Sequence, residues 1–243
     1  MLRHSLIAVF GALLFTACAS SHVVDREKVF DTTTPAARTG WHMQRHAQQM
    51  RFADWGNWRM VFLGDSITQS WEGAGQKVWA EHYEERDALN LGISGDRTQH
   101  VLWRLQQGVL DGLHPQLAVL MIGTNNSGSD TSEAIAAGVL AVVDELRTRQ
   151  PDMVVLVLAI FPRGRDAGDR LRQVNEGAND LIEAQLERDA DPKVHWLDIG
   201  PAFLAEETLL PREIMPDLLH LSPEGYRRWA EAIEPVVSIF VEE

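Results

Sequence analysis

A serine at the end of a short apolar run is the first residue of this sequence whose position suggests chemistry. The run from Met60 to Leu63 predicts a buried strand, and Gly64, Asp65 and Ser66 follow it directly. A turn at this point lifts the Ser66 hydroxyl to the rim of a sheet, where ligands bind in open α/β folds. With a base within reach this hydroxyl is a nucleophile. Without a base, Ser66 is a helix N-cap, which is a common use of serine after a strand.

A nucleophilic serine needs a base, and the base needs a residue that orients it. Of nine histidines, His220 is the best candidate, because it lies just before the last expected helix. Asp217, three residues upstream, can fold back on the imidazole and fix its tautomer. The alternative is a surface histidine near a helix start. The arrangement differs from that of α/β-hydrolases, whose Gly-x-Ser-x-Gly turn has a glycine where this chain has Thr68.

Donors for an oxyanion are available at the ends of three expected strands. Ser66 and Gly95 can present backbone N–H groups, and Asn125 can present a side-chain amide. A donor of this kind typically contributes about 3–4 kcal/mol of transition-state stabilisation. The alternative interpretations are an ordinary turn glycine at position 95 and an Asx-turn at Asn125.

Four further residues are candidates for binding. Trp71 follows the nucleophile turn, and we expect it either to wall the acyl pocket or to pack in the core. Arg163 lies in the loop after the fourth strand and is expected either to contact an acidic or sugar substrate or to be solvated. His42 and His46 are four residues apart, but Met43 stands where the zinc-protease pattern has glutamate. No metal site is predicted.

Strand and helix patterns alternate along the chain. Strands are expected at residues 60–63, 88–91, 117–122, 154–160 and 194–197, and helices at 41–52, 76–84, 97–107, 131–149, 169–188 and 223–241. Near-continuous apolar strands are typical of a parallel sheet covered on both faces. The expected fold is therefore α/β, a three-layer αβα sandwich with a flavodoxin-like parallel sheet of about five strands, formed by one domain over residues 39–243.

Four sequence blocks, in order, resemble those of the SGNH (GDSL) hydrolase superfamily. They are Gly64-Asp65-Ser66-Ile67, Gly92-Ile93-Ser94-Gly95-Asp96, Gly123-Thr124-Asn125-Asn126 and Asp217-Leu218-Leu219-His220. The residues of these blocks are most similar to those of the branch that contains the catalytic subunits of platelet-activating-factor acetylhydrolase and related bacterial esterases. The resemblance implies that Ser66 is the nucleophile, His220 the base and Asp217 its orienter. It also implies an oxyanion hole formed by Gly95, Asn125 and the Ser66 amide.

The expected activity is hydrolysis of carboxylic esters through an acyl-enzyme, without a metal or an organic cofactor. The sequence has no long apolar lid segment, which favours a short acyl group, such as acetyl on a carbohydrate, over a long-chain lipid. Two alternatives stay open. One is an O-acyltransferase that uses the same residues, and the other is a non-enzymatic lipoprotein that binds glycans or lipids.

The N-terminal residues predict export. Arg3 precedes an apolar run at residues 6–15 and small residues around Cys18, which is typical of a secretory signal. We expect a signal peptide over residues 1–17 and a linker over 18–38. The pattern resembles a bacterial lipoprotein signal, in which Cys18 is lipidated and anchors a periplasm-facing or cell-surface protein. The alternative is a soluble exported protein.

Composition narrows the range of partners. The net charge is −13, which argues against binding to nucleic acid and against charge-driven binding to acidic lipid surfaces. The single cysteine excludes an internal disulfide. The expected partner is a small ester or an acylated carbohydrate, and membrane contact is expected only through the N-terminal anchor. The sequence does not predict an oligomeric state.

Overall fold

The computed structural model describes residues 31–53 and 56–241. The predicted signal peptide, Cys18 and the first part of the predicted linker lie outside these residues, so these expectations stay predictions. No helix within the described ranges is both long and apolar enough to cross a membrane.

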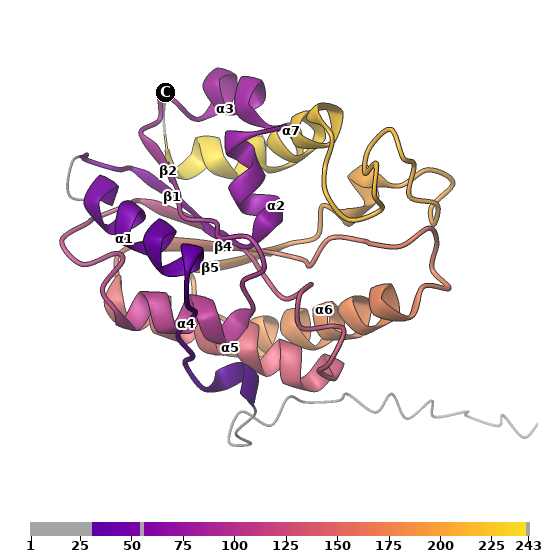
Figure 1. Ribbon diagram of the computed structural model, residues 1–243, viewed down its shortest axis with the longest axis horizontal. Coiled ribbons are helices and arrows are strands. Elements are labelled where there is room, and N and C mark those ends of the chain that lie inside the picture. The colour runs from indigo at the N-terminus through magenta and orange to yellow at the C-terminus, as the bar shows by residue number, and fades with distance from the viewer. Residues whose placement is uncertain (1–30, 54–55, 242–243) are drawn as a thin grey trace, which may run out of the picture.

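A five-stranded sheet forms the centre of the domain (Figure 1). Its strands are β1 (Met60–Gly64), β2 (Ala88–Asn90), β3 (Leu117–Met121), β4 (Val154–Leu158) and β5 (Val194–Leu197). All pairs are parallel, and the strand order is β2-β1-β3-β4-β5. The predicted α/β class and parallel sheet are thus confirmed. Every residue of β1, β3 and β4 is buried, as expected for strands covered on both faces.

Helices cover both faces of the sheet (Figure 1). The α-helices are α1 (Trp41–Ala53), α2 (Ser66–Gln69), α3 (Gln76–His82), α4 (Thr98–Gln106), α5 (Ser132–Arg149), α6 (Arg170–Asp189) and α7 (Pro223–Phe240), and the short 3-10 helices are η1 (Asp31–Thr33), η2 (Ser70–Glu72) and η3 (Gly200–Phe203). Alternate strand side chains enter two separate cores, as the period of a β-strand dictates. Val61 and Leu63 pack with α4, α5 and α6, whereas Met60 and Phe62 pack with α3 and α7.

The strand order brings three distant loops together. Because β1 lies between β2 and β3, and all strands run the same way, the segments that follow these three strands emerge side by side at one rim. These segments begin at Asp65, Leu91 and Ile122, and they carry the first three sequence blocks. The sheet therefore places at one edge residues that are up to sixty positions apart.

The structure differs from the sequence expectation ahead of α1. Residues 31–38 were expected to belong to a linker, but η1 packs against α4 and α5, and Thr32 is fully buried. Hydrogen bonds explain this, because the Thr32 Oγ1 donates to the carbonyl of Ala134 at 2.6 Å. In the sequence, a threonine-rich segment without periodicity is typical of a linker. In the structure, the polar groups of Thr32 form hydrogen bonds with α4 and α5.

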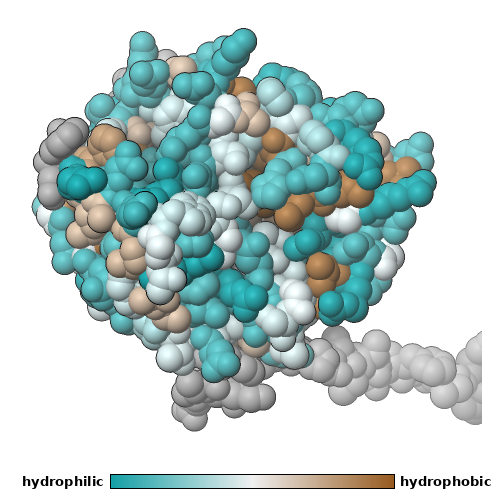
Figure 2. Space-filling model, viewed as in Figure 1, coloured by the Kyte–Doolittle hydropathy of each residue, from teal (hydrophilic) through white to brown (hydrophobic). Residues whose placement is uncertain are grey.

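Hydrophilic side chains cover most of the face shown in Figure 2. Hydrophobic residues come to the surface in patches at the right of this view, over the loops that follow β4 and β5. Among the larger apolar side chains of this region, Leu209 is 36% exposed.

Candidate active site

Ser66, His220 and Asp217 form a continuous hydrogen-bonded series. Ser66 Oγ lies 2.9 Å from His220 Nε2, although the two residues are 154 positions apart. On the other side of the ring, His220 Nδ1 lies 2.7 Å from Asp217 Oδ2. Ser66 is half-buried, and the His220 side chain is 39% exposed, so the series opens to solvent. This is the arrangement that activates a serine hydroxyl for attack on an acyl group.

The loop that carries His220 is held by its own aspartate. Asp217 Oδ1 accepts hydrogen bonds from the N–H groups of Leu219 at 3.0 Å and His220 at 2.7 Å. Leu218 adopts a positive φ of 63°, and its carbonyl accepts a bond from the N–H of Gly164 at 2.9 Å. Partial burial raises the pKa of the Asp217 carboxyl, but the hydrogen bonds from the His220 ring and backbone outweigh it, so the pKa lies below its ordinary value. Asp217 is therefore a carboxylate aimed at Nδ1.

Asp65 fixes the turn that presents Ser66. It is fully buried and caps α2, because its Oδ1 accepts the N–H of Ile67 at 2.9 Å. Burial, with the charge of Asp96 in support, raises the pKa of Asp65 to about 7. From the opposite side, the Tyr226 hydroxyl donates to the carbonyl of Ile67 at 2.6 Å. The first turn of α2 is thus held by a helix cap and by α7.

Gly95 occupies a turn in which glycine is required. Its φ is +76°, a region that other residues rarely adopt, and the turn is closed by a bond from the N–H of Asp96 to the carbonyl of Ile93 at 3.0 Å. Within the described part of the chain, the Gly95 N–H donates no hydrogen bond. At Gly92 the same loop touches α2, since a Cβ there would lie 2.3 Å from the backbone nitrogen of Gln69.

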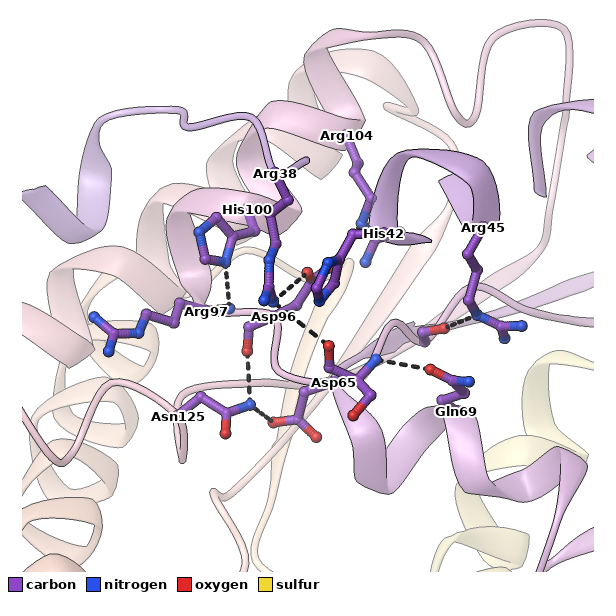
Figure 3. Close-up of polar contacts among 12 residues, drawn as sticks. Arg38, His42, Arg45, Asp65, Gln69, Asp96, Arg97, His100, Arg104 and Asn125 are labelled. Atoms are coloured by element: carbon purple, nitrogen blue, oxygen red, sulfur yellow. Dashed lines mark hydrogen bonds and ion pairs between the residues drawn. The ribbon is translucent and has the colours of Figure 1, made fainter. Parts of the chain in front are cut away.

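Asn125 lies between the loops after β1 and β2 (Figure 3). Its Nδ2 donates to the carbonyl of Asp96 at 2.9 Å and to Asp65 Oδ2 at 3.3 Å. The side-chain amide is therefore oriented by a backbone carbonyl and makes a longer second contact with a carboxyl group.

Trp71 and Arg163, two of the candidate binding residues, differ in their surroundings. Trp71 is 1% exposed and packs among aromatic rings, with Tyr226 at 4.5 Å and Trp229 at 5.0 Å between ring centroids. It therefore takes the second of the two expected positions, in the core. Arg163 is half-buried, and its Nη1 donates to the carbonyl and the Oγ1 of Thr124, both at 3.1 Å. Burial lowers the pKa of Arg163, while nearby carboxylates, including Asp217, act in the opposite direction.

The two histidines of α1 have separate environments. His46 is buried against the ring of Trp103, and burial lowers its pKa to about 4. His42 Nδ1 lies 3.2 Å from the carbonyl of Thr39. Among the described residues, no group of three or more metal-ligating side chains is found.

Several residues at the site were not identified from the sequence. Asp96 and Arg104 form a buried ion pair at 2.9 Å, with both side chains at most 4% exposed. Gln69 Oε1 accepts the N–H of Ser94 at 2.8 Å. Arg38 and the arginine at position 45 also reach this loop from the N-terminal segment (Figure 3). No spacing rule links these residues, because they come from α1, α2, α4 and the segments before α1 and after β2.

Comparison with known proteins shows the family of the chain. A family model described as GDSL-like lipase/acylhydrolase matches residues 62–228. The chain is 38% identical over 178 residues to platelet-activating factor acetylhydrolase IB subunit alpha1 from Homo sapiens, with 73% of this chain and 74% of that protein covered. The chain belongs to the GDSL-like lipase/acylhydrolase family, within the SGNH hydrolase superfamily, and it is an enzyme of the hydrolase class.

Solved structures share the fold. A GDSL-like lipase from Bacteroides thetaiotaomicron superimposes with a TM-score of 0.65 at 19% identity, covering 80% of this chain and 97% of that chain. A catalytic mutant of an acetylxylan esterase from Geobacillus stearothermophilus superimposes with a TM-score of 0.58, also at 19% identity, covering 72% and 92% of the two chains.

Proposed function

We propose that this enzyme hydrolyses carboxylic esters through an acyl-enzyme formed on Ser66. The main support is the hydrogen-bonded series from Ser66 through His220 to Asp217. His220 takes the hydroxyl proton as the Ser66 oxygen attacks the ester carbonyl carbon. The protonated ring then gives this proton to the alkoxide of the leaving alcohol as the ester bond breaks. Asp217 holds the Nδ1–H and stabilises the charged ring.

The second half of the cycle regenerates the serine. Water attacks the acyl carbon, and His220 accepts one of its protons. The ring returns this proton to the Ser66 oxygen as the acyl bond breaks, and the carboxylic acid leaves. No other group is needed to balance the protons, because the same imidazole acts as base and as acid in both halves.

Three donors are suited to the oxyanion that forms in each half. They are the N–H groups of Ser66 and Gly95 and the side-chain amide of Asn125. Neither backbone N–H donates a hydrogen bond within the described residues. Asn125 would exchange its longer bond, to Asp65 at 3.3 Å, for one to the oxyanion. Its bond to the carbonyl of Asp96 would keep the amide oriented.

The proposed substrate is an ester of a short acyl group, in particular an acetyl group on a carbohydrate. Leu218 and Leu219, which precede His220, are half-buried against the core, so only part of each side chain is left to contact an acyl group. Arg163 has Nε and Nη2 donors without a partner among the described residues, and these suit hydroxyl or carboxylate oxygens. The names of the relatives, an acetylhydrolase and an acetylxylan esterase, agree with an acetyl ester.

Substitution of the nucleophile tests this function. Ser66→Ala should lower kcat on p-nitrophenyl acetate by roughly 10⁵-fold or more, because the triad acts as a unit. Ser238→Ala, on the exposed surface of α7, is the matched control and should leave the rate unchanged. Turnover by the Ser66 variant at the wild-type rate would refute the role of this residue.

Chain-length and product measurements test the substrate. Rates on p-nitrophenyl esters should fall as the acyl chain lengthens beyond a few carbons, and acetate should be released from acetylated xylooligosaccharides. A preference for long chains would contradict the proposal of a short acyl group. If an added sugar acceptor captured most of the acyl group in place of water, the protein would be an O-acyltransferase that uses the same residues.

A further inference from the structure

A segment ahead of the family match supplies side chains to the loop that follows β2. We name residues 31–53 the N-terminal strap, which comprises η1, the connecting residues and α1. We name residues 92–96 the oxyanion turn. The family model begins at residue 62, so the strap lies outside the matched residues. Figure 3 shows side chains of the strap converging on the oxyanion turn.

The strap is anchored on two helices before it reaches the turn. Thr32 is fully buried, and its carbonyl accepts a hydrogen bond from Thr98 Oγ1 at 2.9 Å. Its own Oγ1 donates to the carbonyl of Ala134 at 2.6 Å. The N–H of Ala36 donates to the carbonyl of Gln99 at 3.0 Å. These bonds to α4 and α5 fix the position from which the next residues extend.

Arg45 ties the oxyanion turn to the element that follows the nucleophile. Its Nε donates to the carbonyl of Gly92 at 2.9 Å, and Gln49 adds a second donor to this oxygen at 3.2 Å. The other edge of the Arg45 guanidinium binds both carboxylate oxygens of Glu72 at 2.6 and 3.1 Å. Glu72 lies in η2, six residues after Ser66. A single side chain of the strap thus contacts both halves of the site.

Arg38 contacts the peptide group that carries the proposed donor. Its Nη1 lies 3.5 Å from the carbonyl oxygen of Ser94 and 3.5 Å from Asp96 Oδ1. A Cβ built on Gly95 would be 3.1 Å from this same nitrogen. The guanidinium therefore lies against the turn, and the second oxygen of Asp96 is held by Arg104 at 2.9 Å.

The geometry of the peptide bond connects this contact to catalysis. The carbonyl of Ser94 and the N–H of Gly95 belong to one planar trans peptide, so they point in opposite directions and turn together. A cation at the carbonyl end fixes the direction of the N–H. It also polarises the peptide, which strengthens the N–H as a donor. Gln69 holds the preceding peptide by accepting the N–H of Ser94 at 2.8 Å.

We propose that Arg38 and Arg45 are positioning residues for ester hydrolysis, which act through the Ser94–Gly95 peptide and the carbonyl of Gly92. This inference rests on the proposed esterase function. In this role both arginines act through the backbone of the oxyanion turn and not through contact with the substrate. Their removal leaves the triad intact but frees the oxyanion turn to rotate, and displacements of about 1 Å in such groups cost up to about 100-fold in rate.

Kinetics of single variants test this inference. Arg38→Ala and Arg45→Ala should each lower kcat on p-nitrophenyl acetate by roughly 10- to 100-fold, with KM changed by less than about two-fold. Arg38→Lys should recover part of the loss, because it keeps the charge. The matched control is Arg97→Ala, since Arg97 is on the same loop but its guanidinium contacts Ser129 Oγ at 3.1 Å. The control should retain the wild-type kcat.

A second readout separates positioning from folding. Inactivation by a p-nitrophenyl alkylphosphonate places a phosphoryl oxygen in the oxyanion hole, so its rate should fall by the same factor as kcat. A purely structural role would lower the melting temperature and leave kcat unchanged in the folded range. If Arg45→Ala does not fold, the test of the inference rests on Arg38→Ala. This variant is expected to fold, because the Arg38 side chain is 24% exposed.

The outcomes distinguish this inference from the function on which it rests. An active wild type with Arg38→Ala and Arg45→Ala indistinguishable from Arg97→Ala would refute the role of the strap alone. A loss of activity that only parallels the unfolded fraction would refute it as well. A wild type that hydrolyses no ester would overturn the proposed function, and the positioning role with it.

Discussion

Asp65 is a buried carboxyl group whose titration couples pH to stability. Burial raises its pKa from 3.8 to about 7, the charge of Asp96 adds to this, and the N–H of Ile67 acts in the opposite direction. In the unfolded chain the carboxyl is in water and regains its ordinary pKa. Between about pH 4 and about pH 7 the folded protein therefore holds a proton that the unfolded chain has released.

The sign and size of the effect follow from this difference. Because the folded state binds more protons in this range, the free energy of unfolding falls as the pH rises. One pKa unit corresponds to about 1.36 kcal/mol, so Asp65 should remove about 2–3 kcal/mol of stability between about pH 5 and about pH 8. Above the folded pKa the loss is complete. Asp65→Asn removes this titration and keeps the side-chain shape and the acceptor for Ile67.

Urea denaturation at several pH values measures the effect. The free energy of unfolding of Asp65→Asn minus that of the wild type should increase by about 2–3 kcal/mol from about pH 5 to about pH 8. A constant offset is expected, because the amide nitrogen that replaces Asp65 Oδ2 cannot accept the bond from Asn125 Nδ2, and this offset cancels in the comparison. Asp180→Asn, on the exposed side of α6, controls for the loss of one carboxylate. Parallel pH profiles for wild type and Asp65→Asn would refute the reasoning.

Two further predictions concern the oxyanion donors. Asn125→Ala should lower kcat by roughly 10²- to 10³-fold with little change in KM, measured on p-nitrophenyl acetate, and an unchanged kcat would remove Asn125 from the oxyanion hole. Gly95→Ala should lower the free energy of unfolding by about 1–2 kcal/mol in urea titration, because its φ is +76°, and should lower kcat at least 10-fold by moving the N–H. Wild-type stability and kcat in this variant would show that the turn tolerates a side chain.

Much of the fold could be predicted from the sequence because local patterns carry it. The apolar runs of β1, β3 and β4 are long enough to indicate strands buried on both faces, and the helical segments between them require parallel connections. The four blocks also pointed to Ser66, Asp217 and His220, which the structure brings within hydrogen-bonding distance. The contact between Asp217 and His220 could be predicted because the two residues are only three positions apart.

The surroundings of these residues depended on the tertiary structure. Trp71 had two expected positions, and only the packing of α3 and α7 against the sheet places it in an aromatic core. Residues 31–38 have no periodicity, so the sequence does not show that their polar groups bond to α4 and α5.

The resemblance of four sequence blocks to a known family therefore indicated which residues can do the chemistry, and the local apolar patterns indicated which segments form strands and helices. Only the tertiary structure decided which of these residues contact one another. The contacts join side chains that are far apart in the sequence and that no repeat or regular spacing connects. Arg38 against the Ser94–Gly95 peptide and Asn125 against Asp65 are examples, with partners 56 and 60 positions apart. Such contacts arise when a parallel sheet brings the ends of separate strands to one rim.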